Sequence, residues 1–187
     1  MKYRTLWRKP LSALMLCLLA LGISLSALGM GVPQIQYLTN EEFLAQAFGD
    51  TKPEWKMLRL TGGLKKQVED ILQHPYAGMR LRYWVAGQRT AWIIDEIGKD
   101  MPITMGLVVE GNAIQDVKIL VYREERGGEV HQDFFTRQFQ QVTLAENGGL
   151  SKNIDGITGA TLSVGAVSRV AQLVLVMHRQ VMGQPAR

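Results

Sequence analysis

The chain has almost no cysteine: its one cysteine among 187 residues, Cys17, lies inside an apolar segment near the N-terminus. The rest of the chain therefore contains no disulfide and no cysteine-based metal site. Its histidines, His74, His131 and His178, are scattered, with no pair four residues apart and no neighbouring run of carboxylates. This spacing argues against a haem or metal site. Any redox chemistry would therefore come from a bound organic cofactor.

Acidic residues are absent from the first forty positions, and Glu41 is the first of them. The four basic residues before position 11 account for the whole formal charge of +4: Lys2, Arg4, Arg8 and Lys9. The rest of the chain is electrically balanced, whereas nucleic-acid-binding domains keep a basic surface. We therefore expect no nucleic-acid partner. A content of 47% hydrophobic and 20% charged residues also argues against a disordered chain and a multi-span membrane protein.

Residues 11–32 carry no charge and follow the basic N-terminus directly. A signal peptide would use Leu11–Ile23 as its apolar region and Ala27–Gly29 as its cleavage site. A membrane anchor needs about 20 apolar residues, and Leu11–Met30 supplies them. We favour the retained anchor, because the apolar run is longer than a signal peptide requires.

Basic residues ahead of an apolar segment keep the N-terminus in the cytoplasm. Both interpretations therefore place the rest of the chain outside it. The expected organisation is a signal-anchor segment over residues 1–32 and an exported domain over residues 33–187. The expected location is the inner (cytoplasmic) membrane, crossed once, with the C-terminal domain on the periplasmic side.

The exported domain contains both helical and strand patterns. Residues with helical spacing or helix-start signals predict helices that begin at Thr39–Glu42 and cover Leu64–Gln73, Val130–Gln141 and Thr161–Val181. In the third helix, we expect Phe134, Phe135 and Phe139 to point inwards. A short strand is expected at Trp55–Leu60.

From Met79 onward the apolar residues alternate, which indicates strands. One hairpin is predicted around Ala86–Arg89, and a second joins Met105–Val109 to Asp116–Tyr122 through a glycine-bearing turn. Four strands in series with short connections form an antiparallel meander. The predicted fold is α+β, with this meander packed against helices.

The stretch DGITGATLS, residues 155–163, is a small-residue loop that leads into the last helix. Gly159 permits unusual backbone angles and close approach by a ligand, and Ala160 adds little bulk. Free N–H groups in the first turn of a helix form an anion site, at which Thr161, Thr158 and Ser163 offer hydroxyls. The pattern suits a phosphate that is either bound or ester-linked.

A plainer interpretation is that Asp155, Thr158 and Thr161 only cap the helix, since these residue types are preferred caps in any protein. Asp155 is an awkward direct partner for a phosphate. We expect it to cap N–H groups of the loop, or to engage a metal or an enzyme during a modification reaction.

The segment DGITGAT resembles the flavinylation motif Dxx(S/T)GA(T/S) of the FMN-binding domain family. The best-known members of that family are the small anchored subunits of the Rnf and Na⁺-translocating NADH:quinone reductase complexes. The resemblance implies that Thr161 receives FMN through a phosphoester bond. It also implies a separate flavin transferase of the ApbE type, which donates FMN from FAD and needs Mg²⁺. The resemblance covers roughly residues 80–180.

One loop departs from the family pattern. After the second strand of the second hairpin the family usually has Glu-Thr-Pro-Gly, whereas this chain has Glu124-Glu125-Arg126-Gly127. Glu124 and Gly127 match, so Glu124 is a candidate for orienting the flavin. The resemblance implies Asp155, Thr158, Gly159, Ala160, Thr161 and Glu124 as cofactor-binding residues, and the hydroxyl at the helix start adds Ser163 to the candidates. The strand aromatics Tyr83, Trp84 and Trp92 could stack on the flavin ring or simply fill the core.

The expected function is that of a tethered redox shuttle, in which FMN accepts and passes on electrons. No side chain need act as an acid or a base, so no catalytic residue is expected and an electron carrier is favoured over a stand-alone enzyme. Membrane redox partners and the flavin transferase are the expected partners. Two alternatives are an exported flavin-dependent reductase and a module that binds FMN or another phosphorylated ligand without a covalent bond.

Overall fold

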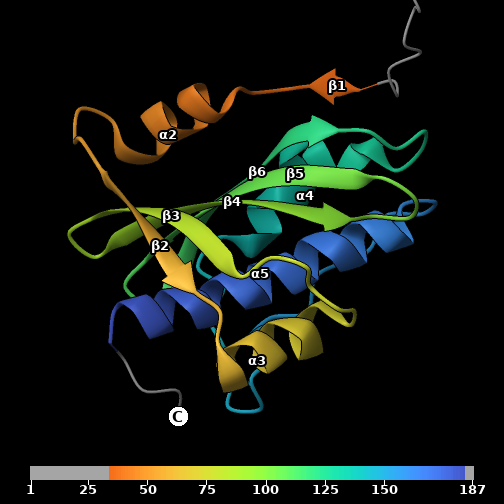
Figure 1. Ribbon diagram of the computed structural model, residues 1–187. Coiled ribbons are helices and arrows are strands. Elements are labelled where there is room, and N and C mark those ends of the chain that lie inside the picture. Colours follow the sequence, from red (N-terminus) through yellow and green to blue (C-terminus); the bar gives the residue numbers. More distant parts are fainter. Residues whose placement is uncertain (1–33, 184–187) are drawn as a thin grey trace, which may run out of the picture. The chain divides into compact units, whose positions relative to one another are not determined.

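The computed structural model describes residues 34–183 (Figure 1). The predicted signal-anchor segment and Cys17 lie outside the described residues. The domain is built on one six-stranded sheet in which all neighbouring strands are antiparallel, in the order β1-β6-β5-β4-β3-β2. Its strands are β1 (Ile35–Gln36), β2 (Glu54–Arg59), β3 (Arg80–Ala86), β4 (Arg89–Ile97), β5 (Pro102–Glu110) and β6 (Ala113–Tyr122).

The described helices cover both faces of this sheet, α5 and α3 on one face and α2 on the other (Figure 1). The predicted α+β fold with an antiparallel meander is therefore confirmed. The helical elements are α2 (Asn40–Phe48), α3 (Gly62–Leu72), α4 (Asp133–Thr136), α5 (Thr161–Val181) and the 3₁₀ turns η1 (Gly128–His131) and η2 (Arg137–Phe139).

The main core lies between α5 and the sheet. Val167, Val170 and Val174 of α5 are buried with Trp92 and Leu107 of the central strands. By length and composition α5 could cross a membrane, but most of its apolar stretch is buried inside the domain. It therefore serves as the core helix of this domain, as its continuous apolar pattern predicted.

A second, smaller core lies between α2 and the opposite face of the sheet. Phe43 and Ala47 of α2 pack there with Val108 and neighbouring apolar residues. Gly106 makes room for this packing, because a Cβ atom at that position would lie 2.7 Å from the Phe43 ring. The guanidinium group of Arg89 donates to the Ala47 carbonyl at 2.8 Å and so ties the end of α2 to β4.

The predicted helix over Val130–Gln141 is wrong. The segment forms η1, α4 and η2 in turn, with extended backbone at Gln132 between the first two. The end of the segment is hydrogen-bonded to β6. The Gln141 amide donates to the Ile114 carbonyl, and the Ile114 amide donates to the Val142 carbonyl. Phe135 and Phe139 are buried as predicted, but Phe134 is 58% exposed. Adjacent residues of a helical turn point about 100° apart, so Phe134 and Phe135 do not share a face.

Candidate functional site

The first turn of α5 has no side-chain cap. A turn closed by the Ala160 amide and the Ile157 carbonyl leads into the helix, and Gly159 adopts a φ of +84° within it. The first bond within the helix runs from the Val164 amide to the Ala160 carbonyl at 2.9 Å. Within residues 34–183, the preceding N–H groups, those of Thr161, Leu162 and Ser163, have no acceptor. The interpretation of Asp155, Thr158 and Thr161 as helix caps is therefore wrong.

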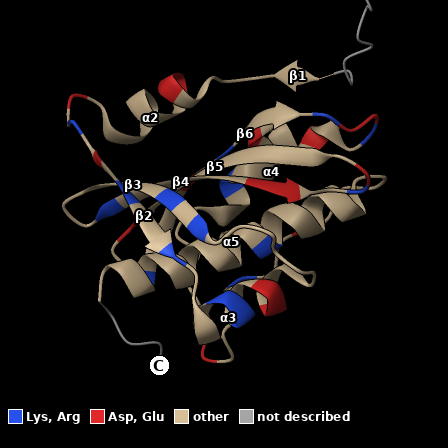
Figure 2. Ribbon diagram, viewed as in Figure 1, with Lys and Arg blue, Asp and Glu red and all other residues tan. Residues whose placement is uncertain are grey.

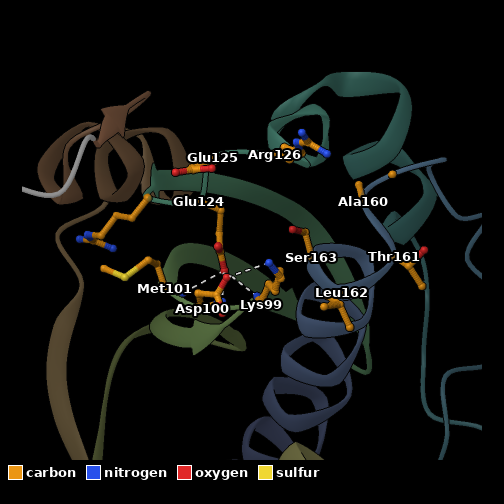
Figure 3. A pocket seen from close by; sticks show the side chains of 12 residues that line it. Lys99, Asp100, Met101, Glu124, Glu125, Arg126, Ala160, Thr161, Leu162 and Ser163 are labelled. Atoms are coloured by element: carbon orange, nitrogen blue, oxygen red, sulfur yellow. Dashed lines mark hydrogen bonds and ion pairs between the residues drawn. The ribbon is translucent and has the colours of Figure 1, made fainter.

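A cavity of about 780 Å³ opens beside this turn (Figure 3). Its walls are the start of α5, the loop between β4 and β5, and the segment that follows β6. A cavity of this size suits a cofactor, since ligand pockets commonly measure about 300–1,000 Å³. The residues that line it are Lys99, Asp100, Met101, Arg123, Glu124, Glu125, Arg126, Gly159, Ala160, Thr161, Leu162 and Ser163.

A second cavity of about 460 Å³ adjoins the first, and both are lined by Glu125, Arg126 and Gly159. On its far side the rings of Tyr37 and His131 are stacked, with centroids 4.1 Å apart. Burial, with a smaller contribution from Glu129, raises the pKa of the Tyr37 hydroxyl. Sequence reasoning missed this pair, because the two residues are far apart in the chain and neither lies in a recognisable motif.

Glu124 holds the loop between β4 and β5. One of its carboxylate oxygens, Oε1, accepts hydrogen bonds from the amides of Lys99, Asp100 and Met101 at 2.5, 2.8 and 2.9 Å (Figure 3). Gly98 permits this approach, because a Cβ atom there would lie 2.9 Å from the same oxygen. Glu124 thus shapes one wall of the cavity, a role that the sequence pattern did not reveal.

Ser163 joins the start of α5 to the end of β6. Its side chain is buried, and its Oγ lies 2.9 Å from the Tyr122 hydroxyl. That hydroxyl donates to the Arg126 carbonyl at 2.5 Å, so the Ser163 hydroxyl is the donor to Tyr122. Gly127 packs directly against the hydroxyl groups of Ser163 and Tyr122. It has a φ of +85°, and a Cβ atom at this position would lie 2.9 Å from each hydroxyl oxygen.

The comparison with protein families agrees with this geometry. Residues 98–176 match the model of the FMN-binding domain family. This segment is an FMN-binding domain. It contains the loop held by Glu124, the glycine at 127 and the start of α5, and hence the walls of the larger cavity. The chain is a flavin-binding protein, and FMN is its cofactor. A search of curated proteins finds no match to the chain.

Most residues of the small-residue loop are exposed on the FMN-binding domain, whereas Ala160 and Ser163 are buried. Gly159 lines both cavities and Thr158 the smaller one. Thr161 is exposed, and Figure 3 shows its side chain on the opposite side of the first turn from Ser163. This placement leaves the Thr161 hydroxyl accessible from outside the domain.

Asp155 is exposed and lines neither cavity. The expected capping of the loop by its carboxylate is wrong for residues 34–183, where that carboxylate accepts no hydrogen bond. Its backbone is held instead by Gln138, whose amide oxygen accepts the Asp155 N–H at 2.8 Å. Sequence reasoning missed Gln138, because a lone glutamine carries no recognisable signal.

The strand aromatics do not reach either cavity of the FMN-binding domain. Trp92 is fully buried and stacks on Tyr83, with ring centroids 4.9 Å apart. Trp84 is half-buried and belongs to the core on the opposite face of the sheet, beneath α2. In the structure these rings pack in or against the two cores.

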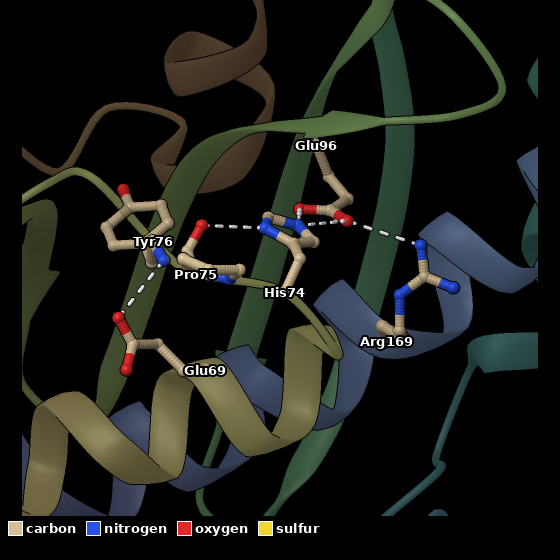
Figure 4. Close-up of polar contacts among 6 residues, drawn as sticks. All are labelled: Glu69, His74, Pro75, Tyr76, Glu96 and Arg169. Atoms are coloured by element: carbon tan, nitrogen blue, oxygen red, sulfur yellow. Dashed lines mark hydrogen bonds and ion pairs between the residues drawn. The ribbon is translucent and has the colours of Figure 1, made fainter.

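A buried carboxylate ties α5 to the sheet and to the end of α3 (Figure 4). The Glu96 side chain is 1% exposed and accepts from His74 Nε2 at 3.0 Å and from Arg169 Nη2 at 3.2 Å. His74 Nδ1 lies 2.9 Å from the Pro75 carbonyl oxygen. The Pro75 carbonyl, followed by Glu96, raises the pKa of His74. The spacing of the histidines in the sequence could not reveal this contact, because it joins residues 22 positions apart.

Proposed function

We propose that this chain is an exported, membrane-anchored flavoprotein that carries FMN esterified to Thr161 and passes electrons between redox partners. The observation that carries the proposal is the uncapped first turn of α5, with an exposed threonine hydroxyl beside a cavity of cofactor size. The match of residues 98–176 to the FMN-binding domain family supports FMN as the group at this position.

The residues present fit a flavin phosphate. The free N–H groups of Thr161, Leu162 and Ser163 point along the helix axis, and the positive end of the helix dipole adds to their attraction for an anion. The cavity wall is charge-balanced, with the cations Lys99, Arg123 and Arg126 beside the carboxylates Asp100, Glu124 and Glu125, so the helix N–H groups are the feature that favours an anion. A capping side chain would occupy these N–H groups, so its absence favours a ligand at this place.

Attachment is proposed to depend on a separate flavin transferase of the ApbE type, which donates FMN from FAD and requires Mg²⁺. Thr161 is the first residue of α5 and is exposed, so such an enzyme can reach its hydroxyl on the folded domain. The exposed carboxylate of Asp155 lies in the same loop and is available to that enzyme or its metal ion.

When bound, FMN supplies one- or two-electron chemistry. The chain's own residues hold it in place: Glu124 fixes one wall, while Ser163 and Gly127 fix the start of α5 against the end of β6. No catalytic side chain is required. A covalent bond prevents loss of the flavin outside the cytoplasm, and an anchor over residues 1–32 would raise the effective concentration of the flavin near membrane partners.

Intact mass and in-gel flavin fluorescence test the attachment. The full chain is produced and exported with and without an ApbE-type transferase. The expected result is a mass gain of one FMN minus one water, mapped to the Thr161 peptide and dependent on the transferase. Thr161→Ala should abolish it, and Thr51→Ala, at an exposed threonine outside the matched segment, is the control that should keep it.

Two other results would point elsewhere. An unmodified mass together with reversible FMN binding would favour the non-covalent binding module. Steady turnover of a soluble acceptor by the purified flavoprotein would favour the exported reductase. Retention of flavin by Thr161→Ala protein under denaturing conditions would show that the attachment site is wrong.

A further inference from the structure

Part of the sheet face beside α2 is uncovered and basic. β2 is an edge strand, and its residues Trp55, Met57 and Arg59 pair with Trp84, Arg82 and Arg80 of β3. Directly paired residues of antiparallel strands lie on the same face. We define Trp55, Met57, Arg59, Arg80 and Arg82 as the β2–β3 face. All five side chains are exposed, Trp55 to 64% and Met57 to 42%.

This face combines apolar and cationic side chains, and no carboxylate in the described residues neutralises its arginines. The Arg82 guanidinium lies 5.7 Å from the centre of the Trp55 ring. Within residues 34–183, none of the guanidinium groups of Arg59, Arg80 and Arg82 forms an ion pair. Figure 2 shows the basic colouring of β2 and β3 in contrast to the acidic patch on α2.

The arrangement costs the domain stability. Arg59 and Arg80 are direct cross-strand partners, and like charges in that position are destabilising. Charged residues on an edge strand also prevent it from pairing with a strand of another molecule. That role does not require the exposed Trp55 and Met57 beside the arginines. Tryptophan, methionine and arginine are the residue types enriched in protein interfaces.

We propose that the β2–β3 face docks a protein partner that presents an acidic surface. Its carboxylates would neutralise the three arginines, and an apolar group would cover Trp55 and Met57. One end of this face lies at the same end of the sheet as one wall of the larger cavity. β3 begins at Arg80 at the end of the sheet where antiparallel β4 runs into the loop Lys99–Met101, which lines that cavity.

A protein fits this face better than a membrane surface does. α2 packs on the same side of the sheet and stands beside the face, and a helix is about 10 Å across. The exposed carboxylates of Glu41 and Glu42 belong to α2 and hence to the same side of the sheet. Anionic headgroups would repel those carboxylates, whereas a protein can present a protruding acidic patch.

Site-specific photo-crosslinking in the native host tests the proposal with the full chain. Benzoylphenylalanine replaces Met57 in the face or, as the matched control, Gln36, which is exposed on the opposite edge strand. The expected result is one discrete adduct from position 57 and none from position 36, with an acidic protein identified in the adduct by mass spectrometry.

Charge variants then decide whether the contact is the proposed one. Arg80→Glu with Arg82→Glu should lower the adduct yield by roughly tenfold or more, because like charges across an interface strongly disfavour binding. Arg80→Lys with Arg82→Lys should retain it. If the double glutamate variant does not fold, the single variant Arg59→Glu tests the same charge reversal. Crosslinking of the unmodified face at raised salt, which screens the arginines, should likewise lower the adduct yield.

Several outcomes would overturn the proposal: no adduct, a phospholipid adduct, an adduct with a second copy of this chain, or a protein adduct that survives charge reversal. The docking proposal does not rest on the flavin bond. The experiment is therefore repeated in Thr161→Ala protein, where the adduct should persist even if the proposed attachment fails.

Discussion

Two helices of this domain begin in opposite ways. α2 starts with a complete capping box, in which the Thr39 hydroxyl accepts from the Glu42 amide and the Glu42 carboxylate accepts from the Thr39 amide. α5 begins at Thr161 and has no side-chain cap at its N-cap position, Ala160, although Thr158, Thr161 and Ser163 lie within three residues of that position. The absence of a cap on α5 is therefore not due to a lack of suitable residues near its start. At α5 the Ser163 hydroxyl bonds to Tyr122 instead, and the first N–H groups have no acceptor in the described part of the chain.

The difference also shows how each helix is held in place. α2 is fastened at its ends, by the Thr39 cap and by Arg89 on the Ala47 carbonyl. α5 is fastened along its flank, where Ser163 bonds to Tyr122 and Arg169 bonds to the buried Glu96. A helix held along its side can leave its first turn open, and the tests below separate the two kinds of attachment.

The largest effect is expected from Gly127→Ala. The residue has a φ of +85°, and the new Cβ atom would lie 2.9 Å from the Ser163 and Tyr122 hydroxyl oxygens. Backbone strain and overpacking together should cost about 3 kcal/mol of unfolding free energy and shift the start of α5, so flavin loading should also fall. Denaturant unfolding and flavin content measure both. Gly87→Ala is the control, since its φ is also positive but no atom lies within 4 Å of the new Cβ. Equal losses in the two variants would contradict the packing argument.

Glu96→Gln should come next. The change removes the buried charge that Arg169 and His74 share, and it should lower the free energy of unfolding by about 2 kcal/mol. The matched control is Glu110→Gln, which removes an exposed carboxylate from its ion pair with Arg89 and should cost less than about 0.5 kcal/mol. Denaturant titration of both variants makes the comparison. Equal effects would show that the buried pair does not secure α5.

The two helix starts can be compared directly by paired threonine substitutions. Thr39→Ala should lower the unfolding free energy by about 1 kcal/mol, as expected for loss of a cap, and leave flavin content unchanged. Thr161→Ala should leave the stability of the flavin-free protein almost unchanged, because Thr161 caps nothing, and should abolish covalent flavin. Thermal melts and intact mass of both variants provide the test. A substantial loss of stability in flavin-free Thr161→Ala protein would mean that the hydroxyl has a structural role.

Local patterns were sufficient for much of the fold. The limits of α5 were predicted correctly, because Gly159 and a long apolar run mark its start and its extent. The hairpin turns at Gly87 and Gly111 were predicted correctly because alternating strands flank glycines with positive φ. The broken segment after β6 was not predicted, since the bonds of Gln141 to Ile114 that redirect it are tertiary.

The same limit applies to the site. The loop from Asp155 to Thr161 was identified from its residue types alone. Its surroundings were not, because the carboxylate of Glu124 reaches across 23 to 25 positions to the β4–β5 loop and Tyr122 reaches across 41 to Ser163. A short motif marks the proposed attachment point, whereas the walls around it come from contacts that only the folded chain brings together.

The smallest expected effect is a pH dependence of the flank attachment. The pKa of His74 is raised in the folded protein, so its contribution to stability is fully present below the unfolded pKa of about 6.5 and is lost as the pH rises through the higher folded pKa. The His74 side chain is 35% exposed, and solvent screening should keep its contribution to the free energy of unfolding below about 1 kcal/mol.

The difference in unfolding free energy between the unmodified protein and His74→Gln should therefore be largest near pH 5.5 and shrink towards pH 9. In the Glu96→Gln background this difference should be smaller, because the carboxylate that helps to raise the pKa of His74 is gone. A difference that grew with pH would mean that folding lowers the pKa of His74, and Arg169 would then be the only cationic partner of Glu96 among residues 34–183.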